Sequence, residues 1–172
     1  MNKNEALKKI DELKKFVEQC DQNEDFVTID YSVIPKEKFD KYGVKPFQIA
    51  KRKARKENGE VWNDINFYDA KKEAEKMGAR LPQLNEMLLL LDAYKEKYPN
   101  DASCDHKEFL GIEELSYQED VCYEWIDSLS VIPFLRGGPW YNSSDAGAFA
   151  LALDSSAGST NLSVGFRCAR GI

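Results

Sequence analysis

The sequence predicts a single α+β domain. Helical periodicity is confined to the part of the chain that ends near Tyr98, and the residues after it form short alternating runs separated by glycine-rich and polar turns. No internal repeat is visible, and 172 residues are enough to bury one sizeable core. This order of helix, strands, two helices and then short strands is typical of the α+β class.

The N-terminal region predicts an extension, residues 1–45, that packs on a main domain formed by residues 46–172. A first helix docks on the domain or, as the alternative, pairs with a neighbouring copy. A strand follows over Phe26–Ile34 and stops at Pro35, because proline cannot donate to a sheet. The helix is indicated by apolar residues at helical spacing: Leu7, Ile10, Leu13, Val17 and Cys20.

The start of the main domain predicts a hairpin and then two helices. Asn58-Gly59, between Phe47–Ile49 and Val61-Trp62, is a typical hairpin turn. A second helix is expected over about 83–98, with Pro82 tolerated at its start. The helix before it ends at Gly78 and shows one apolar face: Phe67, Ala70, Ala74 and Met77.

The remaining residues predict loops and short strands. Residues 101–120 form an irregular acidic loop with a helical turn near Glu113-Glu114, and Val121–Ile126 forms a strand with Trp125 in the core. Alternation then predicts a strand around Phe149–Leu153 and a final strand through residues 164–168.

Composition excludes several classes of function. The net charge of -6 argues against a nucleic-acid-binding surface, and the basic cluster Lys51–Lys56 is interpreted as a solvated strand end or turn. No stretch approaches the ~20 apolar residues of a membrane span, and residues 1–15 are too charged for a secretory signal. We therefore expect a cytoplasmic or virion-associated protein.

Four cysteines bear on metal binding: Cys20, Cys104, Cys122 and Cys168. No CxxC motif occurs, and the spacings match no zinc-binding pattern. Cys104, Cys122 and the single histidine, His106, leave a metal site open as the alternative, but separate thiols explain these residues more simply.

Two motifs frame a stretch of unusually low charge. RGGPW occupies Arg136–Trp140 and GFRCAR occupies Gly165–Arg170. The 24 residues between them, Tyr141–Val164, hold only two charged residues, Asp145 and Asp154. Glycine and aromatic anchors on both sides predict scaffold ends that hold a displayed surface.

With these motifs in view, the chain resembles the formylglycine-generating-enzyme type of C-type lectin fold. The resemblance rests on the tryptophan-led segment Val61–Glu86, which contains RLPQLNE at Arg80–Glu86, on CYEWID at Cys122–Asp127, and on the two framing motifs. It covers roughly two-thirds of the chain, from Val61 to Arg170. It implies two helices and short twisted antiparallel sheets.

One branch of that fold oxidises cysteine with a pair of reactive thiols placed between the two motifs. This chain has no cysteine between Cys122 and Cys168, and the corresponding stretch reads AGAFALAL. Cys168 matches the structural cysteine of the family and cannot supply that chemistry alone. We expect no enzymatic activity, no catalytic residues and no cofactor; an oxidoreductase of this class with shifted residues is the alternative.

The other branch comprises the variable proteins of diversity-generating retroelements, and Ala146–Leu153 is similar to their template. Those systems mutate adenines, chiefly in asparagine codons, and residues 141–163 contain none of the Lys, Glu, Gln, Met or Trp that such changes cannot give. The resemblance implies a hypervariable surface for an unknown protein or cell-surface ligand. A structural virion or surface domain without programmed variation is a further alternative.

The same resemblance divides the segment into frame and surface. Frame positions hold the backbone: Gly137, Gly138, Trp140, Phe149, Leu151, Leu153 and Phe166. Ligand-binding positions are expected to vary: Pro139, Tyr141, Asn142, Ser144, Asp145, Ala152, Asp154, Ser155, Ser156 and Asn161, with Leu162 as a further candidate. Exposed positions tolerate such change because it leaves no cavity in the core.

Trp62-Asn63-Asp64 spells a WND motif, with which C-type lectins bind calcium and sugar. Here it lies early in the domain and lacks its partner motif, so we interpret Asn63 or Asp64 as a helix cap. Sugar binding is the alternative at this site.

Overall fold

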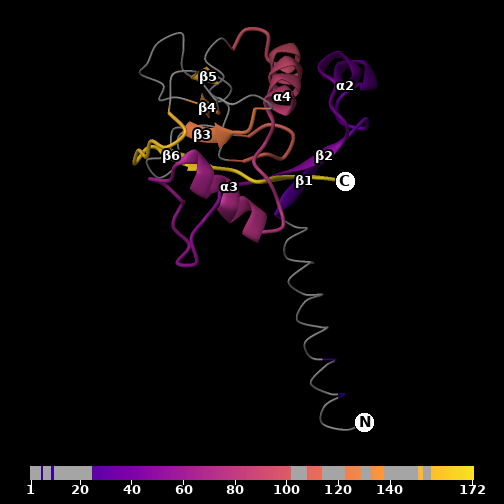
Figure 1. Cartoon of the computed structure of the whole chain (residues 1–172). Helices are drawn as coiled ribbons and strands as arrows, with labels where there is room; N and C mark the ends of the chain where they lie inside the picture. Colours follow the sequence, from indigo (N-terminus) through magenta and orange to yellow (C-terminus); the bar gives the residue numbers. More distant parts are fainter. Residues whose placement is uncertain are drawn as a thin grey trace.

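The computed structural model confirms the α+β class, with helices α2 to α4 and two small sheets in the part of the chain that it describes (Figure 1). The described residues are 5, 9, 25–101, 108–113, 123–128, 133–137, 151–152 and 156–172. In chain order the elements are β1 (Phe26–Ile29), α2 (Lys36–Tyr42), β2 (Phe47–Ala50), α3 (Phe67–Lys76), α4 (Leu84–Lys97), β3 (Tyr123–Ile126), β4 (Phe134–Gly137), β5 (Leu151–Ala152), β6 (Val164–Phe166) and β7 (Ala169–Gly171).

The first sheet joins two strands from the N-terminal part of the chain, β1 and β2, with the C-terminal strand β7. Its order is β1-β2-β7, and both pairs are antiparallel. The strand predicted over Phe26–Ile34 is shorter than expected and ends at Ile29. The backbone N–H of Ser32 donates to the Asp30 side chain at 2.8 Å, and this local turn replaces further pairing.

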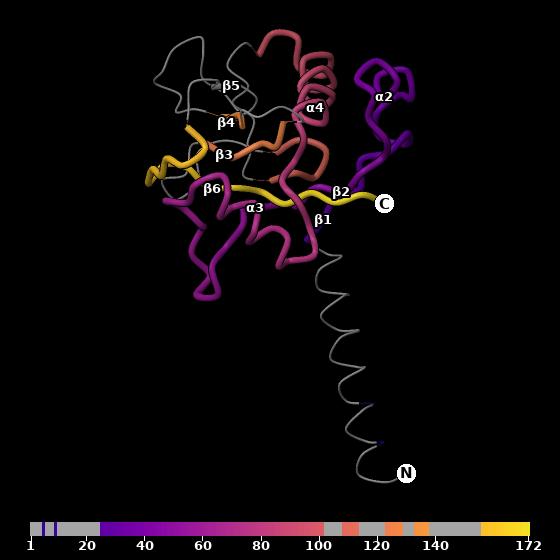
Figure 2. Tube along the Cα trace, viewed as in Figure 1, coloured from indigo at the N-terminus to yellow at the C-terminus, as the bar shows by residue number. Residues whose placement is uncertain are grey.

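The second sheet has the order β5-β4-β3-β6 and places β3 at its centre. β3 is antiparallel to β4 but parallel to β6, which corrects the expectation of purely antiparallel sheets. The predicted final strand is also divided, because β6 belongs to this sheet and β7 to the first. Figure 2 shows the yellow C-terminal run leaving β6 and ending beside β2, so Arg167-Cys168 carries the chain from one sheet to the other.

The hairpin turn at Asn58-Gly59 is confirmed, although its arms differ from the prediction. Gly59 has φ +86°, a conformation that favours glycine. Lys56 N donates to Glu60 O at 2.9 Å and Trp62 N donates to Ala54 O at 2.8 Å, so the arms are the residues on either side of the turn. β2 pairs with β1 and β7 instead.

Helix α2 lies in a part of the chain for which no helix was predicted. Pro35 precedes it and Gly43, at φ +63°, ends it. With only seven residues it depends on tertiary contacts, since short helices are marginal alone. Phe39 is fully buried, and Lys41 Nζ lies 2.9 Å from Asp92 Oδ2 on α4.

Helix α3 matches its prediction except at its start. Asn66 caps it by accepting a hydrogen bond from the backbone of Asp69 at 2.9 Å, so the prediction of Asn63 or Asp64 as the cap was wrong. Phe67, Ala70 and Ala74 form the buried face, as predicted. Met77, the fourth residue predicted for this face, follows the last helical residue and is 38% exposed, so that part of the prediction was wrong.

Helix α4 is confirmed over Leu84–Lys97, and its start explains the RLPQLNE segment. Gln83 N donates to Glu86 Oε2 at 2.8 Å, which satisfies a backbone donor at the helix start. The guanidinium of Arg80 binds both oxygens of Glu86, at 2.9 and 2.5 Å. Arg80 and Glu86 of this segment therefore act together to cap the N-terminus of α4.

Two core clusters lie under these elements. In the first, Ile29 of β1 and Phe39 of α2 pack with Phe47 of β2 and Leu90 of α4. In the second, α3 packs on the second sheet, where Trp125 is 1% exposed and its indole N–H donates to Ile65 O at 2.8 Å. The predicted core role of Trp125 is confirmed, while the division of the chain at residue 45 stays a prediction.

Most of the predicted helix over residues 7–20 lies outside the described residues. Within the ranges that are described, no helix is long and apolar enough to cross a membrane.

Candidate functional site: a segment held by a buried frame

The predicted display segment, residues 139–163, leaves and rejoins the same sheet, to which it also contributes β5. It departs from the end of β4 and returns at the start of β6, and both strands are neighbours of β3. Gly137, the last residue of β4, has φ +98°, which side-chain-bearing residues rarely adopt. The first glycine of RGGPW is therefore required by the backbone at the point of departure.

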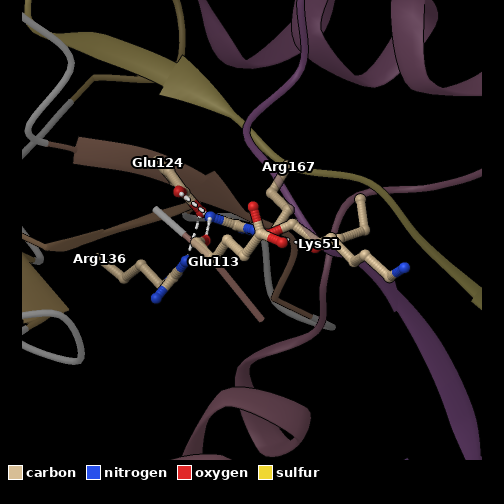
Figure 3. Close-up of polar contacts among 6 residues, drawn as sticks. Lys51, Glu113, Glu124, Arg136 and Arg167 are labelled. Carbon is tan, nitrogen blue, oxygen red and sulfur yellow. Dashed lines mark hydrogen bonds and ion pairs between the residues drawn. The ribbon is translucent and has the colours of Figure 1, made fainter. Parts of the chain in front are cut away.

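The arginines of the two framing motifs meet at one buried carboxylate. Arg136 Nη2 lies 2.5 Å from Glu124 Oε2, and Arg167 Nη2 lies 3.3 Å from Glu124 Oε1. All three residues are at most 3% exposed. Figure 3 shows both guanidinium groups directed toward Glu124.

The sheet register explains why these groups meet. Glu124 stands opposite Arg136 on β4 and opposite Gly165 on β6, two residues before Arg167. Sequence reasoning missed Glu124 and assigned no partner to either arginine. The available signal was an arginine in each motif and a glutamate inside CYEWID.

The network strongly favours the ionised form of Glu124. Burial alone would raise the pKa of Glu124, but the positive charges of Arg136, Arg167 and Lys53 outweigh it and lower the pKa from the ordinary value of 4.5 to about 2. Lys53 is only 3% exposed. The interpretation of Lys51–Lys56 as a wholly solvated cluster was therefore wrong at Lys53, whose charge faces a buried carboxylate.

Arg167 also binds backbone carbonyls from distant parts of the chain. Its Nη1 donates to the carbonyls of Ala50 and Lys51, and its Nη2 donates to Glu113 O at 2.9 Å (Figure 3). One fully buried side chain thus joins β3, the end of β2 and the loop at Glu113.

The closing part of the segment is tied to the start of α3. Phe67 N donates to Ala157 O at 3.0 Å, and Asp64 N donates to Asn161 O at 3.2 Å. The Asn161 side chain accepts from the backbone and hydroxyl of Ser163, at 2.9 and 2.8 Å. The backbone contacts would persist after substitution of Asn161, whereas this local turn needs its side-chain oxygen.

The structure places some of the predicted ligand-binding positions. Ser156, Asn161 and Leu162 are exposed, and Leu162 is 68% exposed. Ala152 lies on β5, opposite Leu135 of β4. The remaining positions lie outside the described residues: Pro139, Tyr141, Asn142, Ser144, Asp145, Asp154 and Ser155.

Of the other candidates for chemistry, Cys168 is buried and the rest lie outside the described residues. Burial raises the pKa of the Cys168 thiol to about 12, and its sulfur lies 3.8 Å from Met77 Sδ. Cys104, His106 and Cys122 lie outside the described residues, and no group of three metal-ligating side chains occurs in the rest.

Two solved structures match this chain: "Major Tropism Determinant U1 Variant" and "Major Tropism Determinant M1 Variant". Each match has a TM-score of 0.48 and 13% identity, and covers 78% of this chain and 47% of the other. The chain is structurally similar to these two tropism determinants. It spans about half of their length. No protein-family model and no curated protein sequence matches the chain.

Proposed function

We propose that this protein is a non-enzymatic ligand-binding protein whose display segment, residues 139–163, is varied by a diversity-generating retroelement. Its role would be recognition of a protein or cell-surface ligand. The name of the two matched structures assigns tropism to those proteins. The proposal for this chain depends on its buried ion pairs and on the motifs RGGPW and GFRCAR.

One observation carries the proposal: Arg136 and Arg167, which bound the segment, share the buried carboxylate of Glu124. These ion pairs hold both ends of the segment through residues that lie outside it. Substitutions at exposed positions within the segment would leave the ion pairs and the core unchanged, and surface substitutions usually alter stability little. A protein that diversifies by mutation needs this separation.

The chemistry of the segment suits non-covalent recognition. Tyr141 offers a large contact area at low entropy cost, and the surrounding Ser and Asn residues provide adaptable hydrogen bonds. The neutral, buried thiol of Cys168 lacks the thiolate character of a reactive cysteine, which supports the non-enzymatic interpretation.

A genomic comparison tests the proposal directly. We expect a reverse-transcriptase gene near the coding sequence, and a near-copy of the segment that differs from it at adenines. Alleles should differ at the predicted ligand-binding positions and keep Glu124, Arg136 and Arg167. Changes scattered over the chain, with no reverse transcriptase nearby, would favour the structural-domain alternative.

A biochemical assay tests the non-enzymatic part separately. Purified protein supplied with copper should not oxidise cysteine-containing peptides. Turnover that survives buffer-exchange and scales with protein concentration would establish the oxidoreductase alternative.

A further inference from the structure

A cavity of about 550 Å³ lies between the start of β1, the residues that follow β2 and the C-terminal end of α3. Its volume falls within the range of about 300–1,000 Å³ that is typical of small-molecule sites. Its described lining includes no residue of the display segment. A ligand in this cavity would therefore bind independently of the variable surface.

The apolar part of the lining is drawn from several elements. Phe26 begins β1 and Met77 follows α3, and these two residues provide the larger apolar side chains. The sulfur of Met77 lies 3.8 Å from that of Cys168, and burial raises the pKa of the Cys168 thiol to about 12, so the thiol is neutral. Ala50 and Ala54 complete this surface. Such a surface favours a ligand with an apolar body.

The cations that line the cavity are already engaged with other groups. Three of them face carboxylates outside the lining, and Arg55 lies in the hairpin, where it donates to the carbonyl of Gly59. Asp25 adds a carboxylate to the lining itself, which opposes an anionic ligand. The three pairs are Lys53 with Glu124, Arg52 with Glu113, and Lys76 with Glu73.

These pairs determine the charge of the ligand that fits. An anion would have to displace a carboxylate that is already in place, and a cation would be repelled by the cations of the lining. A charge buried without a partner lowers affinity, because its hydration is lost and not replaced. A neutral ligand leaves every existing pair intact.

We propose that this cavity binds a small neutral molecule whose body is largely apolar. The body lies against Phe26 and Met77, and its removal from water supplies the affinity. The unbranched thioether side chain of Met77 can adjust to the shape of the ligand.

Methionine methyl signals provide the test. Met77 lines the cavity, whereas Met87 is buried in the first core cluster and serves as the internal control. The full chain with ¹³C-methyl methionine is titrated with naphthylmethanol and with two charged analogues, naphthoate and naphthylmethylammonium. We expect a saturable shift of Met77 with naphthylmethanol and an unchanged Met87 signal. Both charged analogues should bind about tenfold or more weakly, because their charge finds no unoccupied partner.

A cavity-filling variant assigns the Met77 shift to this cavity. Ala54→Leu places a larger apolar side chain in the lining and should weaken naphthylmethanol binding about tenfold or more. Ala93→Leu is the matched control, because Ala93 is also half-buried but lines a different cavity beside α4. The control should change the affinity less than about twofold. Urea denaturation verifies that both variants are folded.

Three results would overturn the proposal: no saturable Met77 shift with naphthylmethanol, binding of either charged analogue as tight as that of the alcohol, or equal weakening by Ala54→Leu and Ala93→Leu. The titrations of the unsubstituted chain decide the matter even if Ala54→Leu fails to fold. Because the described lining lies outside residues 139–163, a failure of the retroelement proposal would leave these expectations unchanged.

Discussion

Replacing Glu124 by glutamine tests the buried ion pairs that join Glu124 to Arg136 and Arg167. The substitution keeps the shape of the side chain but removes the negative charge that Arg136 and Arg167 share. The pKa of Glu124 falls from 4.5 to about 2 on folding. One pKa unit corresponds to about 1.4 kcal/mol, so the ionised carboxylate contributes about 3 kcal/mol to the free energy of unfolding at pH 7.

The sign of the pH dependence follows from the lowered pKa. A carboxyl whose pKa is lower in the folded state contributes its full stability above the unfolded value, near 4.5, and loses it as the pH falls toward 2. The wild-type protein should therefore lose about 3 kcal/mol from this group between pH 4.5 and 2. Glu124→Gln should start about 3 kcal/mol less stable at pH 7 and lack this part of the acid dependence, because two buried guanidinium groups have lost their counter-charge.

Urea denaturation followed by tryptophan fluorescence at a series of pH values measures both quantities. Glu96→Gln is the matched control, because the Glu96 side chain is 68% exposed and its pair with Lys38 spans 2.9 Å at the surface. The control should cost less than about 1 kcal/mol. The reasoning fails if Glu124→Gln behaves like Glu96→Gln, or if it keeps the full acid dependence of the wild type.

Three further predictions concern features outside this network. Asn66→Ala should lower the free energy of unfolding by about 1 kcal/mol in thermal denaturation, since Asp69 N loses its acceptor, and Asn66→Ser should restore most of it; equal losses for both would contradict the cap. Arg80→Gln should lower the free energy of unfolding by about 2 kcal/mol in urea denaturation, because Glu86 is 3% exposed and keeps only backbone partners. A loss smaller than that of an exposed ion pair would refute the cap at α4. Cys168 should resist iodoacetamide at pH 8 until urea unfolds the protein, as its pKa is about 12, and rapid labelling of the native chain in peptide mass spectrometry would contradict its burial.

The helices α3 and α4 were predictable because their signals are local. Apolar spacing, a glycine at the end of α3 and the proline before α4 lie within each segment. The exact cap of α3 was missed, since Asn63, Asp64 and Asn66 are equally suitable residues and only the backbone conformation distinguishes them.

The features that the sequence could not reveal depend on distant partners. Helix α2 carries no long periodic pattern, and its stability comes from the burial of Phe39 and from ion pairs with α4. The parallel pairing of β3 with β6 depends on how the chain returns after the display segment. Lys53 looks solvated within its basic run because the carboxylate it faces, Glu124, lies 71 residues further along the chain.

The framing motifs were recognised by pattern, and the structure supplies their physical reason most clearly at Arg167. This residue lies where the chain crosses from β6 in the second sheet to β7 in the first. Its guanidinium binds Glu124 of one sheet and the Ala50 carbonyl of the other, at 3.3 and 2.8 Å. A lysine ammonium could neutralise Glu124 but could not reproduce the planar fork that reaches several acceptors in fixed directions. Joining the two sheets through one buried side chain therefore requires arginine at this crossover. Because Arg136 binds the same carboxylate, this network also holds the strand from which the display segment departs.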